Sequence, residues 1–189
     1  MVNSFDLRSQ QMVALTRVSF DALRAALLRE GDLAGATQLQ DAGYAGGEAL
    51  YSSFRDWIRA RADTEAGELS TEEFGTLASE FFREAGWGTF ELATLQEAAA
   101  VVDSTNWQEA DPSMALAHPG CHLTTGMLAG FFACVGDTPL AAMEVECRSA
   151  GASRCRFLVG AGPVLTYVFE QLEKGIGYEE AVALVGNRK

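Results

Sequence analysis

The apolar pattern of this chain changes period near Gly86, and that change constrains the fold more than any other feature of the sequence. Before Gly86, apolar residues recur at the three- and four-residue spacing of amphipathic helices, whereas short apolar runs typical of strands follow it. The resulting order is helices, two strands, a helix, two strands and further helices. It predicts an α+β domain with a four-stranded antiparallel sheet packed against helices, preceded by an N-terminal helical segment. The predicted strands span 87–94, 98–103, 139–147 and 154–159, and the later helices span 121–135, 163–174 and 178–185.

Three helices are predicted before this change of period. The first spans 9–29 and carries an amphipathic stripe. The second spans 32–62 and contains three glycines between 43 and 47. A helical glycine costs about 1 kcal/mol relative to alanine, so these glycines indicate either a break or a close backbone contact. The third helix begins at a capping box, in which Ser70 is the cap and Glu73 follows three residues later.

Length and composition favour one globular domain and exclude several partners. The chain has 189 residues, 48% of them hydrophobic, which is enough for a single core. Its formal net charge of -12 argues against nucleic acids and anionic membranes, because these partners attract clustered Lys and Arg. No apolar run reaches the roughly 20 residues of a membrane helix, and the N-terminus lacks the pattern of a secretion signal. We therefore expect a cytoplasmic protein whose four cysteines are thiols or metal ligands.

Cys121, Glu144, Cys147 and Cys155 form a spaced set typical of a closed zinc site, because thiolate sulfur and carboxylate oxygen both suit Zn²⁺. Residues 150–153 have the composition of a hairpin turn, which would bring Cys147 and Cys155 together. In a regular strand, however, Glu144 and Cys147 point to opposite faces, so the strand must end, twist or bulge between them. The residues alone leave a second interpretation open, in which the cysteines are small buried hydrophobes and Glu144 is an exposed strand residue.

Four segments, at residues 119–121, 126–131, 144–147 and 151–157, together resemble the 4-vinyl-reductase domain family, which includes the sensor domains of phenol- and toluene-responsive transcription activators. The phenol sensors hold zinc with a cysteine at a helix start, a glutamate, a cysteine three residues on and a cysteine eight further. The resemblance implies a zinc cofactor in a domain that binds a small hydrophobic or aromatic molecule, with Cys121, Glu144, Cys147 and Cys155 as the metal ligands. The segments are Pro119-Gly120-Cys121, Gly126-Met127-Leu128-Ala129-Gly130-Phe131, Glu144-Val145-Glu146-Cys147 and Gly151-Ala152-Ser153-Arg154-Cys155-Arg156-Phe157, and a looser resemblance reaches back to Gly43.

Three sulfurs and one carboxylate fill a tetrahedron, so we expect a structural metal that joins the helix at Cys121 to the hairpin. The second carboxylate oxygen of Glu144 then needs a donor. Arg154 or Arg156 is predicted for this role because both are near in sequence. Cys134 lies outside the set and is predicted to be a core thiol.

Aromatic residues are concentrated between 74 and 132. Hydrophobic pockets are lined mainly by such side chains, although aromatic residues at helical or strand spacing are more often core. The family resemblance implies a ligand site between the sheet and its helices. The chain departs from the phenol sensors at Ser104, where they have a ligand-orienting tryptophan, and their orienting histidine has no counterpart here. Because of these departures we do not expect phenol as the ligand. The predicted ligand-binding residues are Phe82, Trp87, Phe90, Trp107 and Phe132.

We interpret residues 1–189 as one domain, in which 1–40 is an N-terminal helical segment that contacts a twin subunit in a homodimer and 41–189 is the ligand- and zinc-binding core. The sequence has no nucleophile elbow, phosphate loop or dinucleotide fingerprint, so no catalytic residue is predicted and a binding role is favoured over an enzyme. The leading hypothesis is a zinc-stabilised sensor or carrier. No ATPase or DNA-binding module is expected beyond Lys189, so a separate protein would receive any signal.

Two alternatives stay open. The family name implies an enzyme or accessory protein of tetrapyrrole (bacteriochlorophyll) metabolism. A scaffold subunit without a ligand is the other, because subunits of vesicle-tethering complexes share a related fold.

Overall fold

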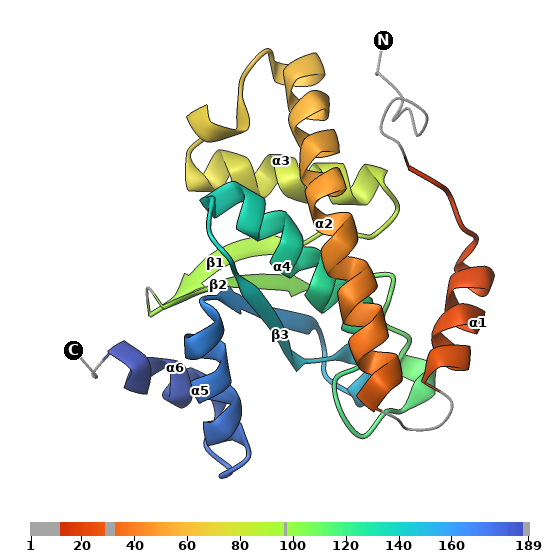
Figure 1. Cartoon of the computed structure of the whole chain (residues 1–189), viewed down its shortest axis with the longest axis vertical. Coiled ribbons are helices and arrows are strands. Elements are labelled where there is room, and N and C mark those ends of the chain that lie inside the picture. The colour runs from red at the N-terminus through yellow and green to blue at the C-terminus, as the bar shows by residue number, and fades with distance from the viewer. Residues whose placement is uncertain (1–11, 29–32, 97, 187–189) are drawn as a thin grey trace.

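The computed structural model of the protein describes residues 12–28, 33–96 and 98–186. Over these residues the chain forms six α-helices and one four-stranded sheet (Figure 1). The helices are α1 (Arg17–Leu27), α2 (Leu33–Ala62), α3 (Thr71–Glu84), α4 (His122–Gly136), α5 (Gly162–Leu172) and α6 (Tyr178–Gly186). The strands are β1 (Glu91–Leu95), β2 (Ala99–Ser104), β3 (Ala141–Glu146) and β4 (Cys155–Gly160), and short 3₁₀ turns lie at Ala66–Glu68, Pro112–Met114 and Arg148–Ala150.

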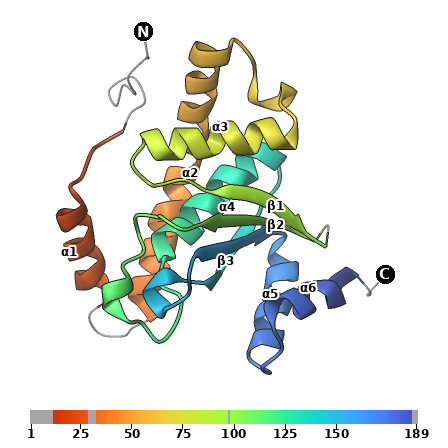
Figure 2. The ribbon, with the colours of Figure 1, turned by 180° about the vertical axis from the view of Figure 1, so that it is seen from behind.

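The predicted α+β fold with an antiparallel four-stranded sheet is confirmed. The strand order is β1-β2-β4-β3, and every neighbouring pair is antiparallel. Helices α2, α3 and α4 cover one face of the sheet, whereas α5 and α6 lie on the other (Figures 1 and 2). The domain therefore has three layers, with β1 and β3 at the sheet edges.

Alternation along the central strands explains why both faces are apolar. In β2, Val102 packs into the core under α2–α4, and its neighbour Val101 packs against α5 and α6. In β4, Phe157 packs on the α2–α4 side and its neighbour Leu158 packs against α5 and α6. A strand buried on both faces needs a continuous apolar run, which is the pattern that the sequence shows here.

Two predicted boundaries are wrong. The first helix begins at Arg17, because the Thr16 side chain accepts a hydrogen bond from the Ser19 amide and so caps the helix; residues 12–16 are not helical. Residues 9–11 of that prediction lie outside the described residues. The first strand begins at Glu91 rather than at 87, because Gly86 and Gly88 take positive φ values that interrupt an extended strand.

The α2 glycines mark a close contact and not a break. Helix α2 runs unbroken. Gly43 faces the α4 backbone at Leu123 and Met127, Gly47 faces it at Gly130, and Gly126 and Gly130 of α4 face the α2 backbone in turn. A Cβ atom on any of these four residues would overlap the backbone of the opposite helix. The capping box of Ser70 and Glu73 at the start of α3 is confirmed in both of its hydrogen bonds. Among the described residues, no helix is long and apolar enough to span a membrane.

Candidate functional site

The fold brings the four predicted metal ligands into one buried cluster, called here the cysteine–glutamate cluster. Cys121 immediately precedes α4, Glu144 lies in β3, Cys147 follows β3 and Cys155 starts β4. One potential ligand atom from each residue lies within 4.8 Å of the others. The Sγ atoms of Cys121 and Cys147 are 3.9 Å apart, close to the edge of about 3.8 Å in a tetrahedron with 2.3 Å zinc–sulfur bonds.

A β-bulge in β3 resolves the problem of strand parity. Glu144 is opposite Phe157 in β4, whereas Glu146, two residues later, is opposite Arg156, so one extra residue is inserted at Val145. Glu144 therefore faces the α4 side of the sheet and Glu146 faces the α6 side. Cys147, the next residue, turns back toward α4. The bulge is what allows a glutamate and a cysteine three residues apart to share one face.

The carboxylate of Glu144 is only half satisfied by the protein. Its Oε2 accepts a hydrogen bond of 2.8 Å from the Cys121 amide. Its Oε1 is buried and has no hydrogen-bond partner among the described residues. The arginines predicted to support Glu144 are elsewhere, because Arg154 pairs with Glu146 and Arg156 pairs with Asp103. That prediction is wrong, because Arg156 precedes Phe157 in β4 and so points to the opposite face of the sheet, and the bulge places Glu146 on that same face.

Burial and the closeness of the four acidic groups oppose the ionisation of all of them at once. Burial, followed by the charge of Cys147, raises the pKa of Glu144 to about 8. Hydrogen bonds from the other two thiols lower the pKa of Cys147, whereas the hydrogen bond with Cys147 raises the pKa of Cys121. An unpartnered buried oxygen and three converging sulfurs fit the donor set of a zinc ion.

Cys134 is separate from this cluster. It lies on α4 and is only partly buried, and it is not part of either core cluster, whereas the sequence predicted a core thiol.

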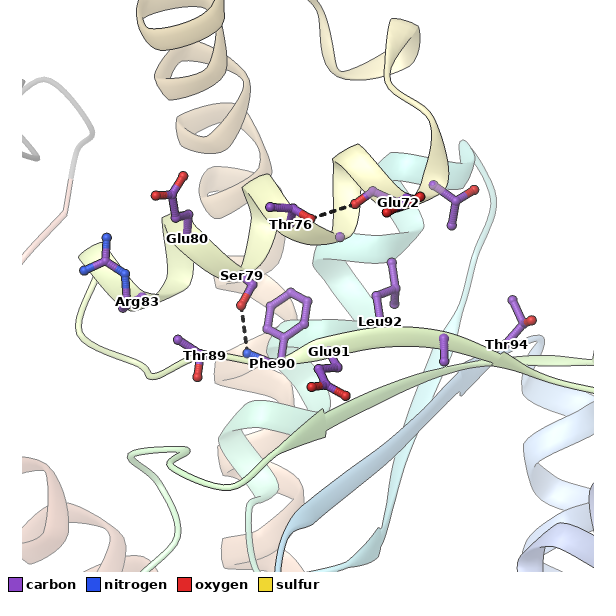
Figure 3. Close-up of a pocket in the computed structure, with 13 residues that line it drawn as sticks. Glu72, Thr76, Ser79, Glu80, Arg83, Thr89, Phe90, Glu91, Leu92 and Thr94 are labelled. Atoms are coloured by element: carbon purple, nitrogen blue, oxygen red, sulfur yellow. Dashed lines mark hydrogen bonds between the residues drawn. The ribbon is translucent and has the colours of Figure 1, made fainter.

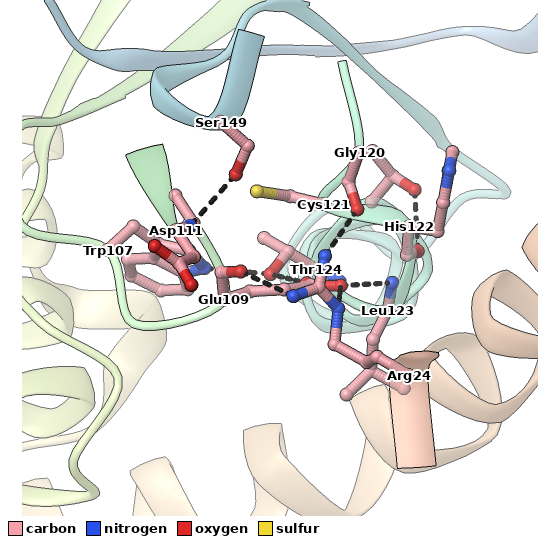
Figure 4. A network of polar contacts seen from close by, with 12 residues as sticks. Arg24, Trp107, Glu109, Asp111, Gly120, Cys121, His122, Leu123, Thr124 and Ser149 are labelled. Carbon is pink, nitrogen blue, oxygen red and sulfur yellow. Dashed lines mark hydrogen bonds and ion pairs between the residues drawn. The ribbon is translucent and has the colours of Figure 1, made fainter. Parts of the chain in front are cut away.

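A second network of polar contacts surrounds the start of α4 (Figure 4). The buried carboxylate of Glu109 accepts hydrogen bonds from the amides of Leu123 and Thr124, which caps the helix. The Thr124 hydroxyl also donates to Glu109 and accepts a 2.7 Å hydrogen bond from the indole of Trp107. On the other side, Arg24 of α1 approaches Glu109. The sequence analysis missed this network, and the sequence carries no local signal that distinguishes Arg24 from the other arginines of the predicted first helix.

The five predicted ligand-binding residues are divided between the core and the surface. The rings of Phe82, Phe90 and Trp107 contact one another in the core. Phe132 is also buried, but its ring partners are Phe74 and Phe131. Trp87 is partly exposed and stacks on Trp107 with 6.0 Å between ring centroids. Trp87 is thus the member of the set that combines ring stacking with solvent access.

Trp87 lines a hollow of about 570 Å³, called here the N-terminal crevice. One wall consists of residues 12–20, where Phe20 meets Trp87 edge-on with 5.9 Å between ring centroids. Leu50 and Leu123 supply apolar side chains from the body of the domain, and Gln108 adds a polar group. The crevice therefore combines apolar walls with a few polar groups, which is the usual character of a small-molecule site.

A second hollow of about 820 Å³ lies between α3 and β1, and is called here the α3–β1 groove (Figure 3). Phe90 of the predicted set lines it, but little of that side chain is exposed. Ser79 accepts a hydrogen bond from the Phe90 amide across the groove. The other side chains of the groove are mainly hydroxyl-bearing, charged or small, so this hollow suits an apolar ligand less well than the N-terminal crevice.

Comparisons with known proteins agree with the family resemblance. The sequence model of the 4-vinyl-reductase domain matches residues 108–161, which contain all four residues of the cysteine–glutamate cluster. The phenol-responsive sensory domain of the transcription activator PoxR, in complex with phenol, is similar in structure; it is 15% identical, with a TM-score of 0.60 over 78% of this chain and 75% of that chain. Subunit 3 of a trafficking protein particle complex from Naegleria fowleri, covalently bound to palmitic acid, is 13% identical, with a TM-score of 0.58 over 76% and 91% of the two chains. No curated protein sequence matches this chain significantly. At these identities the structural similarities establish the fold alone.

Proposed function

We propose that this chain is a zinc-stabilised domain that binds a small hydrophobic or aromatic molecule as a sensor or carrier. The observation that carries the metal assignment is the buried, unpartnered Oε1 atom of Glu144 beside three converging thiols. An unpaired buried carboxylate oxygen is costly, and a bound cation removes that cost. Zinc suits three thiolates and one carboxylate better than magnesium or calcium, which prefer all-oxygen sites.

The metal would have a structural role in this proposal. Four protein ligands complete a tetrahedron and leave no position for a substrate. The ion would join the start of α4 to the β3–β4 hairpin. The residues that would hold it are Cys121, Glu144, Cys147 and Cys155.

Elemental analysis of the full chain, purified without added metal, tests the assignment. We expect about one zinc ion per chain, and metal affinity should fall at least 10- to 100-fold in Cys147→Ala because a primary ligand is lost. Cys134→Ala is the matched control, since its thiol lies outside the cluster, and it should retain the metal. A metal-free wild-type protein that is fully folded and stable would contradict the proposal.

The ligand is proposed to occupy the N-terminal crevice. Its volume of about 570 Å³ falls within the roughly 300–1,000 Å³ of known ligand pockets. The partly exposed ring of Trp87 offers a stacking surface, and Arg17 and Gln108, which are hydrogen-bonded to each other, supply polar groups at the wall of the crevice. The similarity to a phenol-responsive sensory domain supports a small aromatic ligand class, while the departure at Ser104 argues against phenol itself.

A fluorescence titration with 1-naphthol as the probe tests this placement. We expect at least a tenfold loss of affinity in Trp87→Leu and less than a threefold loss in Phe90→Leu, which alters the α3–β1 groove instead. A larger loss of affinity in Phe90→Leu than in Trp87→Leu would place the ligand in the α3–β1 groove instead. Equal affinity in both variants and the wild type would exclude both hollows as the binding site. Tight binding of a porphyrin in place of naphthol would favour a role in tetrapyrrole metabolism.

Self-association is a further part of the proposal. The side of α1 that faces away from the domain exposes large apolar residues, with 78% of Val18, 55% of Leu23 and 40% of Leu27 accessible to solvent. Nearby Leu33 is also exposed. An exposed apolar stripe of this kind is typical of a contact between subunits, so a homodimer is proposed with α1 at its interface.

A further inference from the structure

Helix α1 is held on the domain by a buried arginine. Arg24 is 1% exposed, although the residues before and after it on this helix are largely exposed. Its Nη1 donates a 2.8 Å hydrogen bond to the carbonyl of Glu109, and its Nη2 donates a 2.9 Å hydrogen bond to the carbonyl of Gly120. Its Nε lies 3.2 Å from Oε1 of Glu109, an ion-pair distance without the alignment of a hydrogen bond. All three nitrogens of the guanidinium therefore point at the segment that leads into α4 (Figure 4).

That segment ends at a metal ligand of the proposed site. Gly120 is the residue directly before Cys121, so the hydrogen bond from Arg24 fixes the peptide that enters the cysteine–glutamate cluster. The amide of Cys121 in turn donates to Glu144, the ligand from β3. One continuous chain of contacts thus joins α1 to two of the four proposed metal ligands.

Arg24 acts on the start of α4 through a second route as well. The carboxylate of Glu109 caps α4 at Leu123 and Thr124, two and three residues after Cys121. Arg24 supplies the positive charge that balances this buried carboxylate. If α1 undocked from the domain, the Glu109 carboxylate would lose its partner cation and the Gly120 carbonyl would lose its hydrogen-bond donor.

We propose that Arg24 is a positioning residue of the metal centre, and that docking of α1 and binding of the metal are thermodynamically linked through its contacts with Gly120 and Glu109. This inference rests on the proposed zinc site. Linkage is reciprocal: if docked α1 raises the metal affinity by some factor, the bound metal stabilises docked α1 by the same factor. Arg17 and Phe20 of α1 also line the N-terminal crevice, so the same helix contacts both the crevice and the segment that leads to the metal centre.

Competition with a chromophoric chelator for zinc tests the inference in the full chain. Arg24→Met should bind zinc about 10- to 100-fold more weakly, as expected when an outer partner of a metal ligand is lost. Arg24→Lys, which keeps a charge and one donor group, should recover part of the affinity. Arg17→Met is the matched control, because Arg17 is on the same helix and donates to the Ala110 carbonyl but does not contact Gly120; its affinity should change less than about threefold, as for a partly exposed contact.

The outcomes separate the two proposals. Equal losses in Arg24→Met and Arg17→Met would show that helix docking in general sets the affinity, which would overturn the assignment to Arg24. Unchanged affinity in Arg24→Met would also overturn it while leaving the zinc site intact. A wild-type chain that binds no zinc would overturn the proposed function and this inference together.

Hydrogen exchange on the wild-type chain tests the linkage between α1 docking and metal binding without any substitution. Zinc should slow exchange of the α1 amides, residues 17–27, in addition to those of α4 and the β3–β4 hairpin. Protection limited to α4 and the hairpin would contradict the linkage. In cobalt-loaded protein, Arg24→Met should also shift the visible thiolate–cobalt bands, whereas a role of Arg24 in stability alone would leave them at the wild-type positions.

Discussion

At the scale of single residues, Glu109 shows how this domain buries a charge. Burial raises the pKa of Glu109, and the charge of Arg24 opposes that effect together with hydrogen bonds from Thr124 and the Leu123 amide. The close cation and three donors replace the water that the carboxylate loses, and they favour its ionised form. The Glu109 side chain caps the start of α4 and also pairs with Arg24 of α1.

Glu109→Gln should therefore be strongly destabilising. The amide keeps the shape of the side chain but leaves the Arg24 charge buried without a partner, for which we expect a loss of about 3–5 kcal/mol in the free energy of unfolding. Glu91→Gln is the control, since Glu91 is exposed on the edge strand, and it should change the free energy by less than about 0.5 kcal/mol. Urea denaturation of both variants measures the difference; similar values for the two would contradict the account of Glu109.

At the scale of elements, the crossing of α2 and α4 depends on the absence of side chains. Gly43 and Gly47 on α2, and Gly126 and Gly130 on α4, lie at a spacing of four residues, and each of them contacts the backbone of the opposite helix. Helix α4 begins directly after Cys121, so this contact positions the helix that the cysteine precedes.

Gly126→Ala and Gly46→Ala should have opposite effects. A Cβ atom at Gly126 would overlap the Gln40 carbonyl oxygen, whereas one at Gly46 meets nothing within 4 Å. We expect Gly126→Ala to cost at least about 1–3 kcal/mol through overpacking, and Gly46→Ala to gain about 0.5–1 kcal/mol as a better helix former. Thermal unfolding of both variants checks the signs, and a stable Gly126→Ala protein would show that the crossing can relax.

The capping box of α3 predicts a pH dependence. Hydrogen bonds from the Ser70 side chain and amide lower the pKa of Glu73 below 4.5. A lowered folded-state pKa means that the contribution of Glu73 to stability is present above about pH 4.5 and is lost as the pH falls through the folded-state value. The difference in stability between the wild type and Glu73→Gln should therefore shrink in acid.

Carboxyl NMR titration measures the same effect directly. The pKa of Glu73 should lie below 4.5 in the wild type and move back toward 4.5 in Ser70→Ala, which removes the side-chain donor. An unchanged Glu73 pKa in Ser70→Ala would show that the capping contact does not persist in solution.

At the scale of the whole molecule, the three layers place the candidate sites on one side of the sheet. The cysteine–glutamate cluster lies at the end of β4 that meets α4, in the layer of α2, α3 and α4. The N-terminal crevice lies in the same layer beside α1, and α5 and α6 close the opposite face. Helix α1 is the outermost element on this side of the sheet (Figure 1), and it carries the exposed apolar stripe.

We expect this stripe to hold two copies of the chain together. Wild-type protein should sediment as a dimer at micromolar concentration, and Leu23→Glu should shift it to monomer, because a charge in an apolar interface loses its hydration. Phe169→Glu is the control, since Phe169 is an exposed apolar residue on the opposite layer, and it should remain dimeric. A monomeric wild type under these conditions would contradict the proposal.

Local signals predicted most of the elements but not all of their ends. The capping box located α3, and the continuous apolar run of β2 indicated a strand buried on both faces. The first helix was predicted about eight residues too early, because its apolar spacing extends upstream of the Thr16 cap that ends the helical geometry. Periodicity reports which face of a segment is apolar, whereas caps decide where the segment stops.

The sequence by itself determined the class of fold, because apolar residues at fixed spacings predict helices and strands. It indicated the four residues of the cysteine–glutamate cluster through their spacing together with the family resemblance, since spacing alone left a second interpretation open. Only the tertiary structure decided how the cluster forms. The bulge at Val145 turns Glu144 toward Cys121, and Arg24 and Glu109 meet from positions 85 residues apart. Local spacing carries no information about such distant contacts, since burial and backbone irregularities depend on the packing of the whole domain.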